Sequence, residues 1–177
     1  MTLIDLSKYR LAKATETLAT AKRDMEAEDY ASANNRAYYC IFHAVRAVLA
    51  LDGEDYKKHS AVIARFTLNY LKTDILPRDY GKLISNASLI RNRSDYEDFY
   101  ICSIEDTQRL VSGAADFLDC VTNYLNTKYT ESAENYYSIL LDCVLCASHP
   151  TANSASQLVP NGRWDRQLPR VGLQNLC

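Results

Sequence analysis

The stretch from Ala31 to Leu51 constrains the fold of this 177-residue chain more than any other feature. Its apolar residues recur at intervals of three and four, the spacing that aligns side chains along one face of an α-helix. The residues of this stripe are Tyr38, Ile41, Phe42, Val45, Val48 and Leu49. A continuous stripe of this kind needs apolar neighbours on several sides, so we expect the helix to lie at the centre of the core.

A second stripe on the same predicted helix carries polar and titratable side chains. Its members are Arg36, Tyr39, His43 and Arg46. They share one helical face and can donate, accept or titrate. Two interpretations are open: the stripe is a functional face, or it holds satisfied polar residues at a seam between two helices.

The rest of the chain favours an all-α fold, because it contains only five glycines and four prolines, and three of the prolines follow residue 149. Helices are predicted over about 5–28, 31–52, 60–71, from Pro77 onward, and 103–128. The first two are joined by a short connection, which predicts an αα-hairpin. The apolar residues of the first helix form a heptad seam: Leu11, Ala14, Leu18, Ala21 and Met25.

The later helices have their own predicted ends and inward faces. Gly53 is expected to end the second helix, Ser60 to cap the third, and Ser103 with its following acids to begin the fifth. The residues predicted to face the core are Ile63, Phe66 and Tyr70; Tyr80, Leu83, Ala87 and Ile90; and Leu110, Ala114, Phe117, Val121 and Leu125. Beside the core face of the fourth helix we expect a stripe of Ile84, Ser88, Arg91 and Asp95.

The predicted organisation has three parts: a helical bundle over 1–128, an extra amphipathic helix over 129–146, and a disordered tail over 147–177. The tail contains no lysine and no tyrosine, and its apolar residues lose their period. An alternative is that the tail derives from a frameshift or an added sequence.

Charge and motif content exclude several classes of protein. The net charge is −2, so no overall basic field indicates nucleic acid binding, and any RNA contact would be local. The chain has no apolar run of membrane-spanning length and no secretory leader at its start, which predicts a cytoplasmic protein. Cys143, Cys146 and His149 match half of a zinc site, and we expect no metal because a second ligand pair is absent. Phosphate-loop, GxSxG and HExxH motifs are also absent.

Three blocks of the sequence resemble the HEPN family, the higher-eukaryote and prokaryote nucleotide-binding domain. They are NRAYYCIFHAVRAVL at 35–49, KKHSAVIARF at 57–66 and RNRSDY at 91–96. The resemblance covers roughly residues 5–128 and is strongest to small stand-alone prokaryotic members. It implies an up-and-down bundle of four or five helices that usually forms a homodimer. It also implies a toxin–antitoxin system, in which such a protein is often encoded beside a minimal nucleotidyltransferase.

Active members of the family carry an arginine, four to six variable residues and a histidine, which form a metal-independent ribonuclease site built across the dimer. Arg91 fits the arginine, but no histidine follows at the required distance. The residues at the corresponding positions are Tyr96, Glu97 and Asp98. A register that starts from Arg93 contains no histidine either.

Several residues are candidates for a site at these blocks. Arg91 could supply a cation for phosphorane charge, and Tyr96 could act as an acid or base, although a tyrosine pKa near 10 makes it a poor base. His43 or His59 could replace the missing histidine only if the fold brings one of them to Arg91. The candidate ligand-binding residues are Arg36, Tyr39, His43, Lys58, His59, Arg93 and Asp95. No cofactor is expected.

Each of these residues also has an ordinary structural interpretation. Lys58 and His59 could belong to a solvated turn, and Arg91 with Asp95 could form a surface ion pair worth about 0.3–0.5 kcal/mol. Three hypotheses therefore remain. The chain is a dimeric HEPN interaction module that binds a nucleotidyltransferase partner, a nucleotide or RNA phosphate; it is a ribonuclease that uses Arg91; or it is a structural bundle without a ligand.

Overall fold

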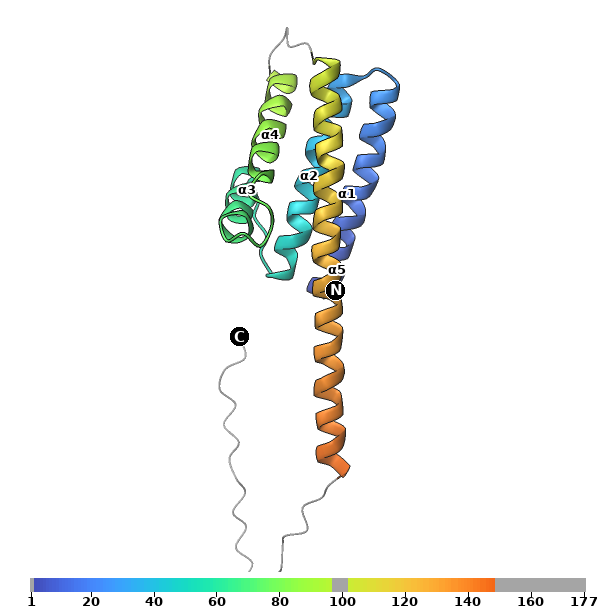
Figure 1. Cartoon of the computed structure of the whole chain (residues 1–177), viewed down its shortest axis with the longest axis vertical. Helices are drawn as coiled ribbons and strands as arrows, with labels where there is room; N and C mark the ends of the chain where they lie inside the picture. The colour runs from blue at the N-terminus through green and yellow to red at the C-terminus, as the bar shows by residue number, and fades with distance from the viewer. Residues whose placement is uncertain (1, 97–101, 149–177) are drawn as a thin grey trace, which may run out of the picture. The chain divides into compact units, whose positions relative to one another are not determined.

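The computed structural model describes the backbone of residues 2–96 and 102–148, and the side chains of residues 2–93 and 102–134. All secondary-structure elements assigned in this part of the chain are helices, which confirms the predicted all-α fold (Figure 1). The elements are α1 (Leu3–Glu26), α2 (Tyr30–Leu51), α3 (His59–Phe66), a π-helical turn η1 (Thr67–Leu71), α4 (Tyr80–Tyr96) and α5 (Ile104–Ser148). Residues 149–177 of the predicted disordered tail lie outside the described residues.

Helices α1 and α2 form the predicted αα-hairpin. A reciprocal capping box begins α1, in which the Thr2 hydroxyl accepts from the Asp5 backbone and the Asp5 carboxylate accepts from the Thr2 backbone. Asp29 caps α2 by accepting from the backbone N–H of Ser32. Three members of the predicted heptad seam are buried, namely Ala14, Leu18 and Ala21, and the other two pack against the core from its edge. The short connection therefore produces the expected pairing of helices.

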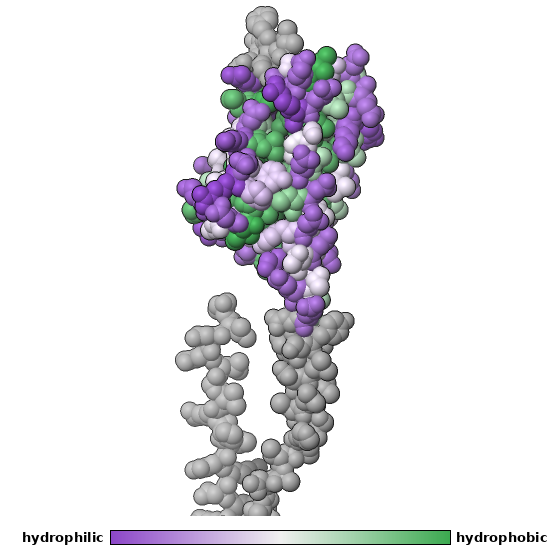
Figure 2. Space-filling view, in the orientation of Figure 1, coloured by the Kyte–Doolittle hydropathy of each residue, from purple (hydrophilic) through white to green (hydrophobic). Residues whose placement is uncertain are grey.

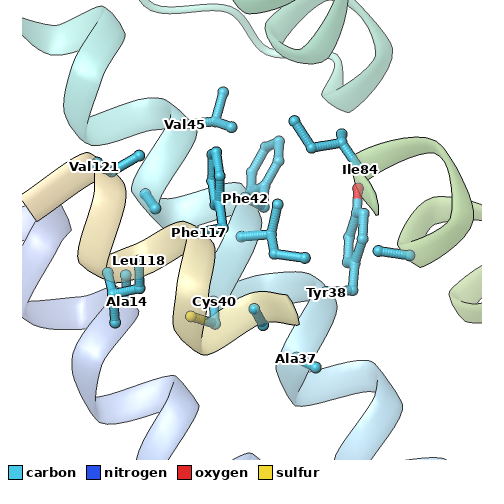
Figure 3. Close-up of a cluster of buried hydrophobic side chains, with 14 of the residues drawn as sticks. Ala14, Ala37, Tyr38, Cys40, Phe42, Val45, Ile84, Phe117, Leu118 and Val121 are labelled. Carbon is cyan, nitrogen blue, oxygen red and sulfur yellow. The ribbon is translucent and has the colours of Figure 1, made fainter. Parts of the chain in front are cut away.

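Helix α2 is the centre of the core, as predicted, and all six residues of its apolar stripe are buried. Its alanines are buried as well, so the helix contacts neighbours on more than one side. Figure 3 shows Phe42 and Val45 of α2 near Phe117 of α5, and Tyr38 facing Ile84 of α4. The predicted inward residues of α5 are also all buried.

The segment between α2 and α4 differs from the prediction in three details. Gly53 has a positive φ of 71° and follows α2 as expected, but α3 begins at His59 with Lys58 as its N-cap, so the prediction that Ser60 is the cap was wrong. The predicted third helix changes to a π-helical turn after Phe66. Ile84, which we placed beside the core face of α4, is 2% exposed and belongs to the core.

Helix α5 begins where predicted, because the Ser103 hydroxyl accepts from the backbone N–H of Asp106. It continues to Ser148, so the residues predicted to form an extra helix over 129–146 belong to α5. Near the far end of the bundle, the buried Ser7 hydroxyl donates to the carbonyl of Ala47 at 2.6 Å and lies 2.7 Å from the Tyr129 hydroxyl. This contact joins α1, α2 and α5. None of the helices in the described residues is long and apolar enough to cross a membrane.

Candidate functional site

The start of α3 brings His59 onto the polar side of α2. Lys58, the N-cap of α3, makes no side-chain capping bond, and a helix N-terminus with this feature favours a negative charge nearby. His59 is exposed on one side, and its ring stacks on Phe42 at a centroid separation of 4.0 Å. The rings of Tyr38 and Tyr39 lie 6.2 and 6.1 Å away. The histidine is therefore held by aromatic packing and keeps an accessible face.

Tyr38 connects His59 to Arg91, two residues that are far apart in the sequence. Its hydroxyl lies 3.1 Å from Nδ1 of His59. The guanidinium carbon of Arg91 lies 6.0 Å from the centre of the Tyr38 ring, at the distance of a cation–π contact. Tyr38 itself is only 3% exposed, and burial raises its pKa, while Arg91 partly opposes that shift. The fold thus brings a histidine, a phenol and an arginine together from α3, α2 and α4.

The charge state of His59 follows from these neighbours. Burial lowers its pKa below the ordinary histidine value, and the positive charges of Arg91 and then Arg46 lower it further. The pKa of His43, on the next turn of α2, is also lowered, first by burial and then by Arg46. At neutral pH His59 is consequently uncharged and can accept a proton, beside an arginine that stays charged.

A network of charges lies near His59, which lines one pocket with Arg46 and Asp55. Asp55, in the connection before α3, accepts from Nη2 of Arg10 at 2.7 Å and from Nη2 of Arg46 at 2.9 and 3.1 Å. Burial raises the pKa of Asp55, but the hydrogen bonds from the two arginines outweigh burial and leave the pKa lowered. The guanidinium of Arg46 also lies 6.0 Å from the Phe42 ring. One carboxylate between two arginines leaves this region positive.

The structure brings four of the predicted site residues together: Arg91, His59, Tyr39 and His43. His59 and Arg91 both contact Tyr38, His59 at its hydroxyl and Arg91 at its ring. Lys58 is exposed next to this group, and Arg36 and Arg93 are exposed on α2 and α4. The side chains of Tyr96 and Asp95 lie outside the described residues.

Three contributors were not predicted as site residues from the sequence. Tyr38 and Phe42 were assigned to the core, and they are buried, but each also presents part of its ring or its hydroxyl to His59. Asp55 was one charged residue of a turn, without a distinguishing signal. The sequence contained one indication of the network, because Arg46 follows the helical spacing of Tyr39 and His43.

This arrangement has the properties of a phosphate site. Arg91 supplies a fixed positive charge, and His59 supplies a group that can donate to or accept from a phosphate or a hydroxyl. The exposed ring of His59 can stack against a planar group. Within the described part of the chain, no group of three or more histidine, cysteine or acidic side chains is placed to hold a metal ion.

The all-α bundle is the fold class that the sequence predicted, and comparison with known proteins agrees. The family model of the HEPN domain matches residues 7–125. The chain belongs to the HEPN domain family.

Two relatives and one solved structure illustrate this membership. A UPF0332 protein of Thermotoga maritima is 32% identical over 64% of this chain and 86% of its own length. A protein of Methanocaldococcus jannaschii named "putative toxin" is 29% identical over 71% of this chain and 85% of its own length. The crystal structure of an archaeal HEPN homologue covers 67% of this chain and 97% of its own, with a TM-score of 0.50 and 19% identity. At that identity, the likeness supports the fold alone.

Proposed function

We propose that the cluster of Arg91, Tyr38 and His59 binds a phosphate of RNA or of a nucleotide. The observation that carries this proposal is that Arg91 and His59 both contact Tyr38, although the two residues are more than thirty positions apart in the sequence. Arg93, exposed two residues after Arg91, adds a positive charge to the same helix on a different face. Such local positive charge can bind RNA even though the chain has a net charge of −2.

The biological setting that we propose is a toxin–antitoxin system, in which the protein acts as a homodimer with a nucleotidyltransferase-type partner. The relatives from Methanocaldococcus jannaschii that carry a toxin name support the setting. The dimer and the partner rest on the family resemblance. Size measurement of the purified protein, alone and with the nucleotidyltransferase encoded nearest to it, would test both.

The phosphate site can be tested with a fluorescently labelled single-stranded RNA. Arg91→Ala should weaken binding and reduce the slope of log K against log salt by about 0.7, the value for one lost contact to a single strand. Arg109→Ala is a matched control, because Arg109 is exposed on α5 and pairs locally with Asp106. Circular dichroism should show equal helicity in all three proteins. Equal RNA affinity of Arg91→Ala and the parent would contradict the proposal.

A second candidate function, metal-independent RNA cleavage, is favoured by one specific observation: the exposed imidazole of His59 and the guanidinium of Arg91 contact the same tyrosine, Tyr38. Burial and then Arg91 also lower the pKa of His59. In such a reaction His59 would take the proton of a 2′-hydroxyl. The 2′ oxygen would bond to the adjacent phosphorus, the bond from phosphorus to the 5′ oxygen would break, and that oxygen would take a proton from water while His59 returns its proton to the solvent. Arg91 would stabilise the charge of the phosphorane. The products would be a 2′,3′-cyclic phosphate and a 5′-hydroxyl.

Cleavage can be separated from binding with variants of the two residues, assayed in excess chelator. If His59 exchanges the proton, His59→Gln should lose at least 100-fold in rate at saturating RNA, the lower end of the usual range for acid–base catalysis, beyond any loss of RNA affinity. Arg91→Ala should lose both. Tyr96→Phe tests the tyrosine at the family's histidine position. An intact RNA ladder after prolonged incubation with the parent protein would exclude cleavage and leave the binding function.

A further inference from the structure

A pocket of about 530 Å³ lies at the end of the bundle where α1 begins and α2 ends (Figure 1). Its walls come from the first turn of α1, the end of α2, the π-helical turn η1 and the middle of α5. None of its described lining residues belongs to the phosphate cluster or to the pocket beside His59. The volume falls within the range of small-molecule sites, which is about 300–1,000 Å³. The proposed function therefore gives this pocket no role.

The pocket holds a carboxylate that forms no ion pair in the described part of the chain. Asp52 is exposed and lines the pocket, and its carboxylate accepts from the Tyr70 hydroxyl at 2.6 Å. None of the ion pairs between described residues includes Asp52. Asp52 also follows the last residue of α2 directly, and the C-terminus of a helix carries partial negative charge that favours a cation.

The cations that act on this region have other partners. Lys128 lines the pocket, and its ammonium bonds to the Glu131 carboxylate at 2.8 Å. Arg65 interacts with the charge of Asp52, but its guanidinium donates to both oxygens of Glu54, at 2.6, 2.8 and 2.9 Å. Each of these positive charges is balanced by its own carboxylate, whereas Asp52 is not balanced. The uncompensated charge of the pocket is therefore negative.

Aromatic and aliphatic side chains form most of the remaining wall. The rings of Tyr70 and Tyr124 meet edge to face, with their centroids 5.9 Å apart. The ammonium of Lys128 lies 6.0 Å from the centre of the Tyr124 ring, so this ring is placed to attract a cation. Leu3 and Leu51 add aliphatic surface. A carboxylate beside such walls suits an organic cation, which has a charged group and an apolar body.

Tyr70 holds the carboxylate of Asp52 in place. Its side chain is only 4% exposed, and its ring stacks on Phe66 in the core at a centroid separation of 5.4 Å. Burial and then the hydrogen bond to Asp52 raise the pKa of Tyr70, so its hydroxyl stays protonated and donates. A carboxylate that is already oriented loses little freedom when a ligand binds, and its oxygens have further lone pairs for an ammonium.

We propose that this pocket binds an organic cation, a primary ammonium that carries an apolar body. The ammonium donates to the carboxylate of Asp52, and the apolar body lies against Tyr124, Leu3 and Leu51. An inorganic cation would leave these apolar walls unused, and an anion would face an uncompensated carboxylate. The site shares no residue with the phosphate cluster, so the inference does not depend on the proposed function.

The test uses the whole protein and three probes with a similar apolar body: 2-phenylethylamine, phenylalanine and 3-phenylpropanoate. They carry a positive charge, both charges and a negative charge, respectively. Each probe is titrated into the isotope-labelled protein, and the backbone amide signals are followed by nuclear magnetic resonance. Asp52→Asn is the main variant, because asparagine keeps the shape and can still accept from Tyr70. Asp79→Asn, at an exposed position before α4, is the matched control.

We expect the parent to bind 2-phenylethylamine more tightly than the other two probes, with the shifted amides around Asp52. Asp52→Asn should weaken this binding about tenfold, the effect of losing a hydrogen bond to a charged group, and Asp79→Asn should leave it unchanged. Lys128→Gln should strengthen it by about twofold, because a like charge is removed from the lining. Circular dichroism should show equal helicity in all of these proteins.

Other outcomes would overturn the inference. Equal affinity of the parent and Asp52→Asn for 2-phenylethylamine would show that the carboxylate does not anchor the ligand. If phenylalanine binds most tightly and Lys128→Gln weakens it, the ligand is a zwitterion and the proposed cation is wrong. Tightest binding of 3-phenylpropanoate would exclude a cation as well. If none of the three probes shifts the amides around the pocket, the pocket is not a site for such a ligand.

Discussion

The two sides of α2 differ in the helices that pack on them and in the size of the packed residues. On one side, α1 packs along α2 through small residues, and Ala14, Ala21, Ala37 and Ala44 are fully buried. On the other side lie a short helix of eight residues, a π-helical turn and α4. This second side carries large exposed apolar residues, among them Leu68, Ile75 and Leu89. Figure 2 shows hydrophobic surface over α3 and α4 among hydrophilic residues.

The α1–α2 side therefore acts as a rigid support, and the other side contributes side chains of the candidate site. The α1–α2 hairpin is regular and closely packed, so it fixes the positions of Tyr38, Phe42 and Arg46 on α2. The shorter elements of the other side then bring His59 and Arg91 to these positions. A functional site assembled on a rigid helix from less regular neighbours combines fixed geometry with an accessible surface.

The largest effect should come from Phe42, which belongs to both sides. It is 6% exposed and also supports the ring of His59. Phe42→Ala should lower the free energy of unfolding by about 3–5 kcal/mol, because it removes a buried ring and leaves a cavity. Denaturant titration measures the loss. A loss below about 1 kcal/mol would mean that the side chain is not part of the core.

An intermediate effect is expected from overpacking the hairpin. Ala44 is fully buried, so Ala44→Leu must push its neighbours apart and should cost about 1–3 kcal/mol of unfolding free energy. Ala31→Leu, at an exposed position near the start of α2, is the control and should be close to neutral. The same denaturant titration compares them. Equal stability of the two variants would contradict close packing along α2.

A small effect is expected on the opposite side. Leu68 is 50% exposed on the π-helical turn, so Leu68→Ala should change the free energy of unfolding by less than about 0.5 kcal/mol. The measurement should be made at low and high protein concentration. A large loss that appears only at high concentration would show that a second copy covers this residue and would weaken the contrast between the two sides.

The smallest effect should be a change in pH dependence at His43. Its folded pKa is lowered, first by burial and then by Arg46, so the unfolded chain binds the proton more readily. The contribution of neutral His43 to the free energy of unfolding is therefore fully present above the unfolded pKa of about 6.5. It is lost as the pH falls below that value. Between about pH 7.5 and about pH 5.5, the parent should lose more stability than His43→Asn. An equal loss in both proteins would show that other groups account for the dependence.

Periodicity predicted the regular side of the molecule well, because the burial of long helices repeats along the sequence. The stripe of α2, the seam of α1 and the inward face of α5 all have this property. The start of α3 and the turn at 67–71 were not predicted, because short helices contain too few repeats to fix their ends. Ile84 was misplaced for a related reason: α4 has core contacts over a wider face than one stripe.

The candidate site was only partly readable from the sequence. The sequence identified candidate residues, namely Tyr39, His43, Arg46, His59 and Arg91. It did not show which of these residues lie close together in the fold. That proximity depends on Tyr38, whose buried ring looks like an ordinary core residue in the sequence. The Asp55 network could not be predicted either, because its partners come from α1 and α2 and share no spacing.

The contact of Ser7 with Tyr129 also determines when folding can finish during synthesis. Ser7 donates to Ala47, so the Tyr129 hydroxyl must be the donor in the other bond, and the two residues are 122 positions apart. At about 5–20 residues per second, the ribosome needs roughly 6–24 s to make that stretch. The hairpin can form early, but its apolar face stays open to water until α5 emerges. A chaperone that shields this face would protect the nascent chain during that interval.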